Sequence, residues 1–123
     1  AFNAAEAVSF GSLPPQSIIY ASFLFCSKTH CPCPTSITVT CIGNSNAKRI
    51  QSVTYIERLV GSSWVRVSIG QTNNQWTEST TARYLAEDYS HQLTTRGTYR
   101  AVVEFTVSGT QTEAITLYSQ DTF

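Results

Sequence analysis

The segment Thr95–Gly109 constrains the fold of this chain more than any other stretch, because its side chains alternate in character at every second position. The apolar set is Tyr99, Ala101, Val103, Phe105 and Val107, and the residues between them are polar apart from Val102. A period of two is typical of a half-buried β-strand, whereas an amphipathic helix repeats about every 3.6 residues. The segment therefore predicts a turn followed by a strand with one face in a core.

The same alternation recurs along the chain, between turns rich in glycine, serine and asparagine. It predicts strands at Ser17–Cys26, Ser36–Gly43, Ile50–Val60, Trp64–Ile69 and Thr112–Ser119, with one or two less regular strands within Trp76–Leu93. No stretch shows sustained helical periodicity. About seven strands joined by turns predict an all-β domain over residues 17–123, folded as a two-sheet antiparallel sandwich.

Two strands allow a prediction of which side chains face the core. In Ser36–Gly43 the inward set is Ile37, Val39 and Cys41. The register of Ile50–Val60 is ambiguous. Its candidate inner faces are Val53, Tyr55 and Leu59, or Ile50 (through a bulge), Thr54, Ile56 and Val60. We favour the face with Ile56, because the other one buries the Glu57 carboxylate beside Tyr55.

Composition narrows the class of protein. Charged residues make up 13% of the 123-residue chain, about half of the roughly 25% typical of globular domains. The formal net charge is zero, so nothing points to nucleic acid or an acidic membrane as a partner. No apolar run approaches the roughly 20 residues that a membrane-spanning helix needs.

Residues 1–16 are small and weakly polar, and they end at Pro14-Pro15. We expect a flexible N-terminal leader there, since the prolines favour extended backbone and block a helix. Small residues also flank the cleavage sites of secretory signals. With the low charge, the Thr/Ser-rich composition and the four cysteines, this favours a secreted or cell-surface protein.

Gly97-Thr98-Tyr99-Arg100-Ala101 resembles the tyrosine corner of immunoglobulin-like sandwiches, where the tyrosine lies two residues before the second core cysteine. Here Ala101 takes that cysteine position, while Cys41 occupies the first one, so the sheet-to-sheet disulfide is absent. The run from Ser36 to Ser119 also resembles small secreted single-domain proteins, of immunoglobulin-like or fibronectin-III-like type, from clostridia-like Firmicutes. The resemblance implies an immunoglobulin-like fold and export, but no assigned activity.

The four cysteines leave alternatives open. The disulfide candidates are Cys26, Cys31, Cys33 and Cys41, which allow three full pairings. A bond between Cys31 and Cys33 is strained, because a single proline separates them. Disulfides are the commoner state in secreted domains. The competing interpretation is a zinc site with the ligands Cys26, His30, Cys31 and Cys33, the first at the start of the irregular segment 27–35 and the others within it. The remaining alternatives for the cysteines are free thiols and an interchain disulfide.

The chain offers little for catalysis. A nucleophile-and-base site needs a histidine oriented by a carboxylate. The histidines are His30 and His91, and we expect His91, with Glu87 and Asp88, in an exposed turn as a solvated polar cluster. No catalytic residues are therefore predicted.

Paired carboxylates for glycoside hydrolysis must face one cleft. The acidic residues of this chain are scattered. We expect Glu104 and Glu113 to point outward, as surface partners of Arg100 or Arg66. The sequence predicts a non-enzymatic protein.

Binding is the remaining class, because sandwich domains bind through their end loops or a sheet face. Candidate ligand-binding residues are Trp76 with Tyr84, as an aromatic platform for a glycan or a protein, and Trp64, for which a place at the core edge is the competing interpretation. A further alternative is a structural or assembly subunit that uses the apolar strand Ile18–Phe25 as its surface or edge.

Overall fold

The computed structural model describes residues 2–8, 17–24 and 32–122, and side chains only within 32–122. Its strands are β1 (Phe2–Val8), β2 (Ser17–Leu24), β3 (Cys33–Gly43), β4 (Arg49–Val60), β5 (Ser63–Arg66), β6 (Trp76–Thr80), β7 (Tyr84–Leu93), β8 (Thr98–Ser108) and β9 (Thr112–Thr122). One 3-10 turn, Thr72–Asn74, lies between β5 and β6. None of the described segments is a helix of the length and apolar character needed to cross a membrane.

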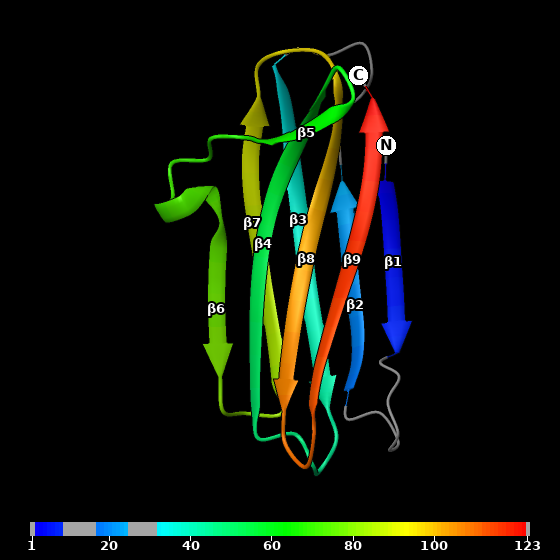
Figure 1. Cartoon of the computed structure of the whole chain (residues 1–123), viewed down its shortest axis with the longest axis vertical. Coiled ribbons are helices and arrows are strands. Elements are labelled where there is room, and N and C mark those ends of the chain that lie inside the picture. Colours follow the sequence, from blue (N-terminus) through cyan, green and yellow to red (C-terminus); the bar gives the residue numbers. More distant parts are fainter. Residues whose placement is uncertain (1, 9–16, 25–31, 123) are drawn as a thin grey trace.

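The strands form two antiparallel sheets stacked face to face (Figure 1). One sheet has the order β1-β2-β3-β7, and the other has the order β5-β4-β8-β9. The short strand β6 also pairs with β4, on residues 50–54, while β5 pairs with residues 57–60. This arrangement confirms the all-β, two-sheet antiparallel sandwich, with nine strands among the described residues against the seven or so expected.

The core between the sheets is built by the predicted alternation. Ile37, Val39 and Cys41 of β3 are buried, and so are the residues from Tyr99 to Val107 that share one face of β8. In β4 the inward set contains Ile56, as favoured above, and it includes Ile50 without a bulge because the pairing with β8 is continuous. The ambiguity of this strand is thereby settled.

Val102 breaks the alternation on β8 and is nevertheless fully buried. It points to the outer face of the five-stranded sheet, where Tyr55 and Tyr118 stand directly opposite it on the two neighbouring strands. Large aromatic side chains at cross-strand positions cover a small neighbour. This outer face is therefore a partly covered surface with its own apolar contacts.

Two boundaries differ from the sequence analysis. Phe2–Val8, expected within a leader, forms β1 and pairs with β2 over its whole length. Cys33–Thr35, expected in an irregular segment, opens β3. Pro34 lies opposite Gln92 of β7, next to the first residue of β3, and the start of a strand is a place where a sheet tolerates proline.

The strand β2 lies inside its sheet. It pairs with β1 on one side and with β3 on the other. Both of its hydrogen-bonding edges are therefore used over residues 18–24, which contradicts the use of this segment as an edge donor, while its use as an assembly surface stays a prediction. Phe25 lies outside the described residues.

Candidate functional site: a pocket at the end of the sandwich

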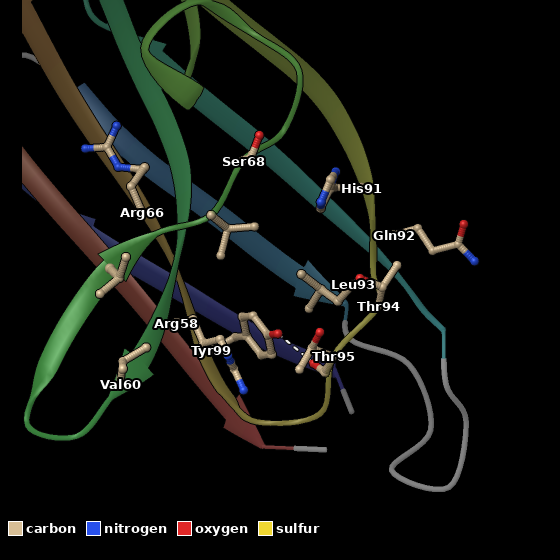
Figure 2. A pocket seen from close by; sticks show the side chains of 12 residues that line it. Arg58, Val60, Arg66, Ser68, His91, Gln92, Leu93, Thr94, Thr95 and Tyr99 are labelled. Atoms are coloured by element: carbon tan, nitrogen blue, oxygen red, sulfur yellow. Dashed lines mark hydrogen bonds between the residues drawn. The ribbon is translucent and has the colours of Figure 1, made fainter.

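A pocket of about 320 Å³ opens between the two sheets at one end of the sandwich (Figure 2). We call it the end pocket. One wall comes from the five-stranded sheet and includes Val60 and residues 65–68. The other wall is formed by residues 91–95, where β7 ends and the turn to β8 begins. The volume is at the lower end of the roughly 300–1,000 Å³ common for small-molecule sites.

The wall on the β4–β5 hairpin is apolar and open. Val60 and Val65 are 51% and 49% exposed, although both side chains are large and apolar. Both line the pocket together with Val67, and Leu93 lines it from β7. Exposed aliphatic side chains around a concavity are typical of a contact site for an apolar group.

Arg58 brings a positive charge to this pocket. Its Nη2 donates a hydrogen bond to the carbonyl oxygen of Arg96 (3.0 Å), and its Cζ lies 6.0 Å from the centre of the Tyr99 ring. Its Nε is buried without a hydrogen-bond acceptor among the described residues. Within 32–122 no carboxylate forms an ion pair with Arg58.

Gly97 explains how the guanidinium fits against the turn. A Cβ atom at Gly97 would lie 2.9 Å from Arg58 Nε. The backbone of Gly97 has no positive φ, so the glycine is required by this close approach and not by its dihedral angles. The side chain of Arg58 and the turn 94–97 are thus packed as one unit.

Tyr99 packs against the unit formed by Arg58 and the turn 94–97. Its side chain is 3% exposed, and its hydroxyl donates a 2.6 Å hydrogen bond to the carbonyl oxygen of Thr95 (Figure 2). A tyrosine that bonds back to the backbone a few residues upstream is the geometry of a tyrosine corner. The predicted corner is therefore present.

His91 lines the pocket from β7, which corrects the prediction that it lies in an exposed turn. Its backbone carbonyl accepts a 2.7 Å hydrogen bond from the hydroxyl of Thr35. Burial lowers the pKa of the imidazole, because desolvation disfavours the charged form. At neutral pH the ring is therefore mainly uncharged.

The two acids near His91 in sequence do not reach its ring. Glu87 lies four residues earlier in the same strand, roughly 13 Å away along the chain. Asp88 is on the opposite face, where it accepts a 2.7 Å hydrogen bond from Thr38. The strand geometry thus separates the imidazole from the carboxylates.

Arg66 borders the pocket, but its guanidinium points away from it (Figure 2). The Cζ atom lies 3.5 Å from the centre of the Tyr55 ring on the outer face of the sheet. Its Nη1 donates to the carbonyl of Asn73 (3.2 Å) and to Gln75 Oε1 (3.4 Å). Arg66 therefore stabilises the outer face and the 3-10 turn.

Trp64, a predicted ligand-binding residue, lies on that outer face. The Arg100 guanidinium is 4.3 Å from the Trp64 ring centre and 5.1 Å from that of Tyr118, and it forms a 2.7 Å ion pair with Glu57. A guanidinium over an aromatic ring is an attractive contact. It occupies the ring surface that a sugar would stack on.

Glu104 and Glu113 were both predicted to face outward, but their environments differ. Glu104 is exposed, and its carboxylate accepts a 2.9 Å hydrogen bond from the Tyr55 hydroxyl instead of pairing with an arginine. Burial and that hydrogen bond raise the pKa of Tyr55 to about 12. Glu113 is 5% exposed and shares the inner face of β9 with Leu117, so the outward prediction is wrong for it. Gln111 donates a 3.2 Å hydrogen bond to Glu113.

Trp76 and Tyr84 do not form the predicted platform. Trp76 stacks on Tyr89, with ring centres 4.8 Å apart and planes inclined by 8°. Tyr84 is 58% exposed and begins β7, five residues from Tyr89 and hence roughly 17 Å along the strand. Burial and the nearby carboxylates of Glu78 and Glu87 raise the pKa of Tyr89 to about 12.

Two of the four cysteines lie in the described residues. Cys33 is buried and disulfide-bonded, while Cys41 is a buried core thiol outside any disulfide, which removes it from the candidate pairings. Cys26, Cys31 and His30 lie outside the described residues, so the zinc site stays a prediction. In the described part of the chain, no group of metal-binding side chains gathers.

No family model matches this chain, and neither a curated protein nor a solved structure matches it. The resemblance to secreted proteins of Firmicutes therefore stays an expectation. Arg58 and the hairpin valines were missed by the sequence analysis. The sequence did contain one signal for this site: Arg58 is a charged residue on the same strand face as the core residue Ile56.

Proposed function

We propose that this protein is a secreted, non-enzymatic β-sandwich binding module whose ligand occupies the end pocket. The observation that carries the proposal is the combination, in one concave site, of an exposed aliphatic wall and a guanidinium without a carboxylate partner. A mostly apolar lining with a few convergent polar groups is the usual makeup of a binding site. The ends of a sandwich are also where its loops present ligand-binding residues.

The aromatic residues predicted for binding have weaker support. Trp76 has one ring face against Tyr89, and Trp64 lies against the Arg100 guanidinium. A glycan platform needs open ring faces, since sugars stack on them through their C–H groups. Tyr84 is exposed but lies apart from Trp76. The end pocket therefore ranks above the aromatic platform.

A binding role fits the surroundings of His91 better than catalysis does. The imidazole is directed to the pocket, but Glu87 and Asp88 lie too far along the strand or on its other face to orient it. General base catalysis needs such an orienting partner within hydrogen-bond reach. We assign His91 a place in the lining.

Secretion is supported by chemistry rather than by a signal sequence. Cys33 is disulfide-bonded, and disulfides persist mainly in oxidising compartments. The low share of charged residues is in keeping with this location. A cystine sulfur is not a thiolate ligand, so the same bond also favours the disulfide over the zinc alternative.

The test is a fragment screen by ¹⁵N–¹H NMR on the full chain. We expect shift changes at the backbone amides of residues 65–68 and 91–95 that saturate with ligand. Val65→Glu should abolish them, because it places a carboxylate in the apolar wall. Ile42→Glu is the matched control, since Ile42 is 45% exposed and lies outside the pocket.

Two outcomes count against the proposal. Saturable shifts confined to Trp76 and Tyr84 would favour the aromatic platform instead. A diverse fragment library that leaves residues 65–68 and 91–95 unshifted would refute the end pocket as a binding site.

A further inference from the structure

We infer that the ligand of the end pocket carries a carboxylate attached to a short branched aliphatic group, with the carboxylate at Arg58 and the aliphatic group against Val60 and Val65. The inference rests on the proposed function and names the chemical class of its ligand. Two sources share this chemistry: a free short-chain carboxylic acid and the C-terminal residue of a peptide.

The charge of the pocket selects an anion. Arg58 is a lining residue whose positive charge lies on the pocket side of the sheet, whereas the guanidinium of Arg66 lies over Tyr55 on the outer face. No acidic residue lines the pocket. A partly buried cation without a counter-charge is stabilised when an anion binds beside it.

The single positive charge of Arg58 favours a ligand with one negative charge. A single guanidinium balances one carboxylate, whereas a phosphate dianion would keep excess negative charge in a pocket whose histidine is mainly neutral. The planar fork of an arginine also matches a carboxylate in two parallel hydrogen bonds. Nε is buried and one N–H of Nη2 is used by the Arg96 carbonyl, so the fork left for a carboxylate is formed by Nη1 and the second N–H of Nη2.

The guanidinium is already held in position. Its contact with the Arg96 carbonyl fixes one end, Gly97 leaves room for Nε, and the Tyr99 ring lies beneath at 6.0 Å. A donor that is held before the ligand arrives loses little conformational freedom on binding. This preorganisation distinguishes Arg58 from an arginine on an exposed surface.

The aliphatic side chains around Arg58 set the size of the attached group, since Val65 is its cross-strand partner and Val60 lies two residues along the same strand. Val60, Val65, Val67 and Leu93 offer branched aliphatic contacts, and the whole pocket measures about 320 Å³. That space suits a carboxylate with a leucine-like or valine-like group. The hydroxyl of Ser68, which also lines the pocket, can donate a hydrogen bond to the carboxylate or accept one from a peptide N–H.

The experiment compares isosteric acids and amides by NMR titration of the full chain at pH 7.5. One pair is 4-methylpentanoate and 4-methylpentanamide, and the other is N-acetyl-leucine and N-acetyl-leucinamide. We expect each acid to bind about tenfold more tightly than its amide, the range of a charge-assisted hydrogen bond. Tighter binding of 4-methylpentanoate identifies a free acid as the source, and tighter binding of N-acetyl-leucine identifies a peptide C-terminus.

Variants of Arg58 test whether this residue causes the preference for acids over amides. Arg58→Gln should reduce the acid-to-amide ratio to near one, and Arg58→Lys should keep part of it through the remaining charge. Arg49→Gln is the control and should leave the ratio unchanged, because Arg49 lies outside the pocket and donates a hydrogen bond to Ser79. The wild-type comparison stands by itself if an Arg58 variant does not fold.

The results distinguish an error in the carboxylate assignment from an error in the proposal that the end pocket binds a ligand. Acids and amides that bind in the end pocket with equal affinity would overturn the carboxylate assignment while the binding site stands. An acid preference that survives Arg58→Gln would equally overturn it.

Discussion

The Tyr99 hydroxyl donates a 2.6 Å hydrogen bond to the carbonyl oxygen of Thr95, four residues upstream. The bond ties the start of β8 to the turn that follows β7, and the tyrosine ring is buried beneath Arg58. One side chain thereby fixes the turn that forms the base of the end pocket. Stability and the shape of the site depend on the same contact.

Replacing this hydroxyl tests that dependence. We expect Tyr99→Phe to lower the free energy of unfolding by about 1 kcal/mol, because the part-buried hydrogen bond to the Thr95 carbonyl is lost. Urea denaturation monitored by fluorescence gives the value. Tyr118→Phe is the control: Tyr118 is 56% exposed and should change stability little. Equal costs for the two variants would contradict the assigned role.

Gly97 and Arg58 should be energetically coupled. We expect Gly97→Ala to cost about 1–2 kcal/mol, because the added Cβ lies 2.9 Å from Arg58 Nε and must displace it. In an Arg58→Ala background the same substitution should cost much less. A double-mutant cycle by urea denaturation measures the coupling, and additive costs would show that the contact is not responsible.

His91 should make stability depend on pH in one direction. Burial lowers the pKa of its imidazole below the ordinary value of 6.5, so between the two values the unfolded chain binds more protons than the folded one. Stability from this group is fully present above pH 6.5 and falls as the pH drops below it.

Denaturation midpoints measured from pH 7.5 to pH 5 test this dependence. His91→Gln should flatten the slope in that range, because glutamine does not titrate. A slope that is unchanged in His91→Gln would assign the proton uptake to another group.

The stack of Trp76 on Tyr89 joins the two sheets, since β6 belongs to one and β7 lies in the other. We expect Trp76→Ala to cost about 3 kcal/mol through lost burial and stacking, and to change the near-ultraviolet circular dichroism. Trp64→Ala is the matched control on the outer face and should cost less than about 1 kcal/mol. The reverse order of costs would contradict the inter-sheet role of Trp76.

The two described cysteines should behave differently towards alkylating reagents. Under non-reducing conditions we expect Cys33 in a cross-linked peptide, and Cys41 to be alkylated only after unfolding because it is fully buried. Peptide mapping by mass spectrometry identifies the partner of Cys33. Four thiols with one equivalent of zinc would instead establish the metal site.

The strand pattern predicted most of the sandwich because alternation reports which face is buried. It predicted the inner faces of β3 and β8 residue by residue and the Ile56 register of β4. The start of β3 was missed because prolines flank Cys33, and the pairing of this segment with β7 depends on residues far away in the sequence. Glu113 was assigned to the surface for its charge, although its parity with Leu117 indicated the core.

The end pocket was less accessible to sequence reasoning. Its walls come from the hairpin at Val60 and Val65 and from the end of β7 near Leu93, which belong to different sheets. Local alternation shows which way each side chain points but not where two sheet ends meet. Arg58 gains its role only from contacts with Arg96 and Gly97, which are made after the turn has folded.

The outer edge of β4 is shared by two short strands, β5 along residues 57–60 and β6 along residues 50–54. The chain leaves the sheet between them through the 3-10 turn, and only Val67 bridges the gap by donating to the Ile56 carbonyl. Because neither short strand offers a long straight edge, this side of the molecule is a poor template for cross-β aggregation. The interruption also makes the connection a natural place for foreign loops to be grafted, since its length can change without shifting the register of either strand.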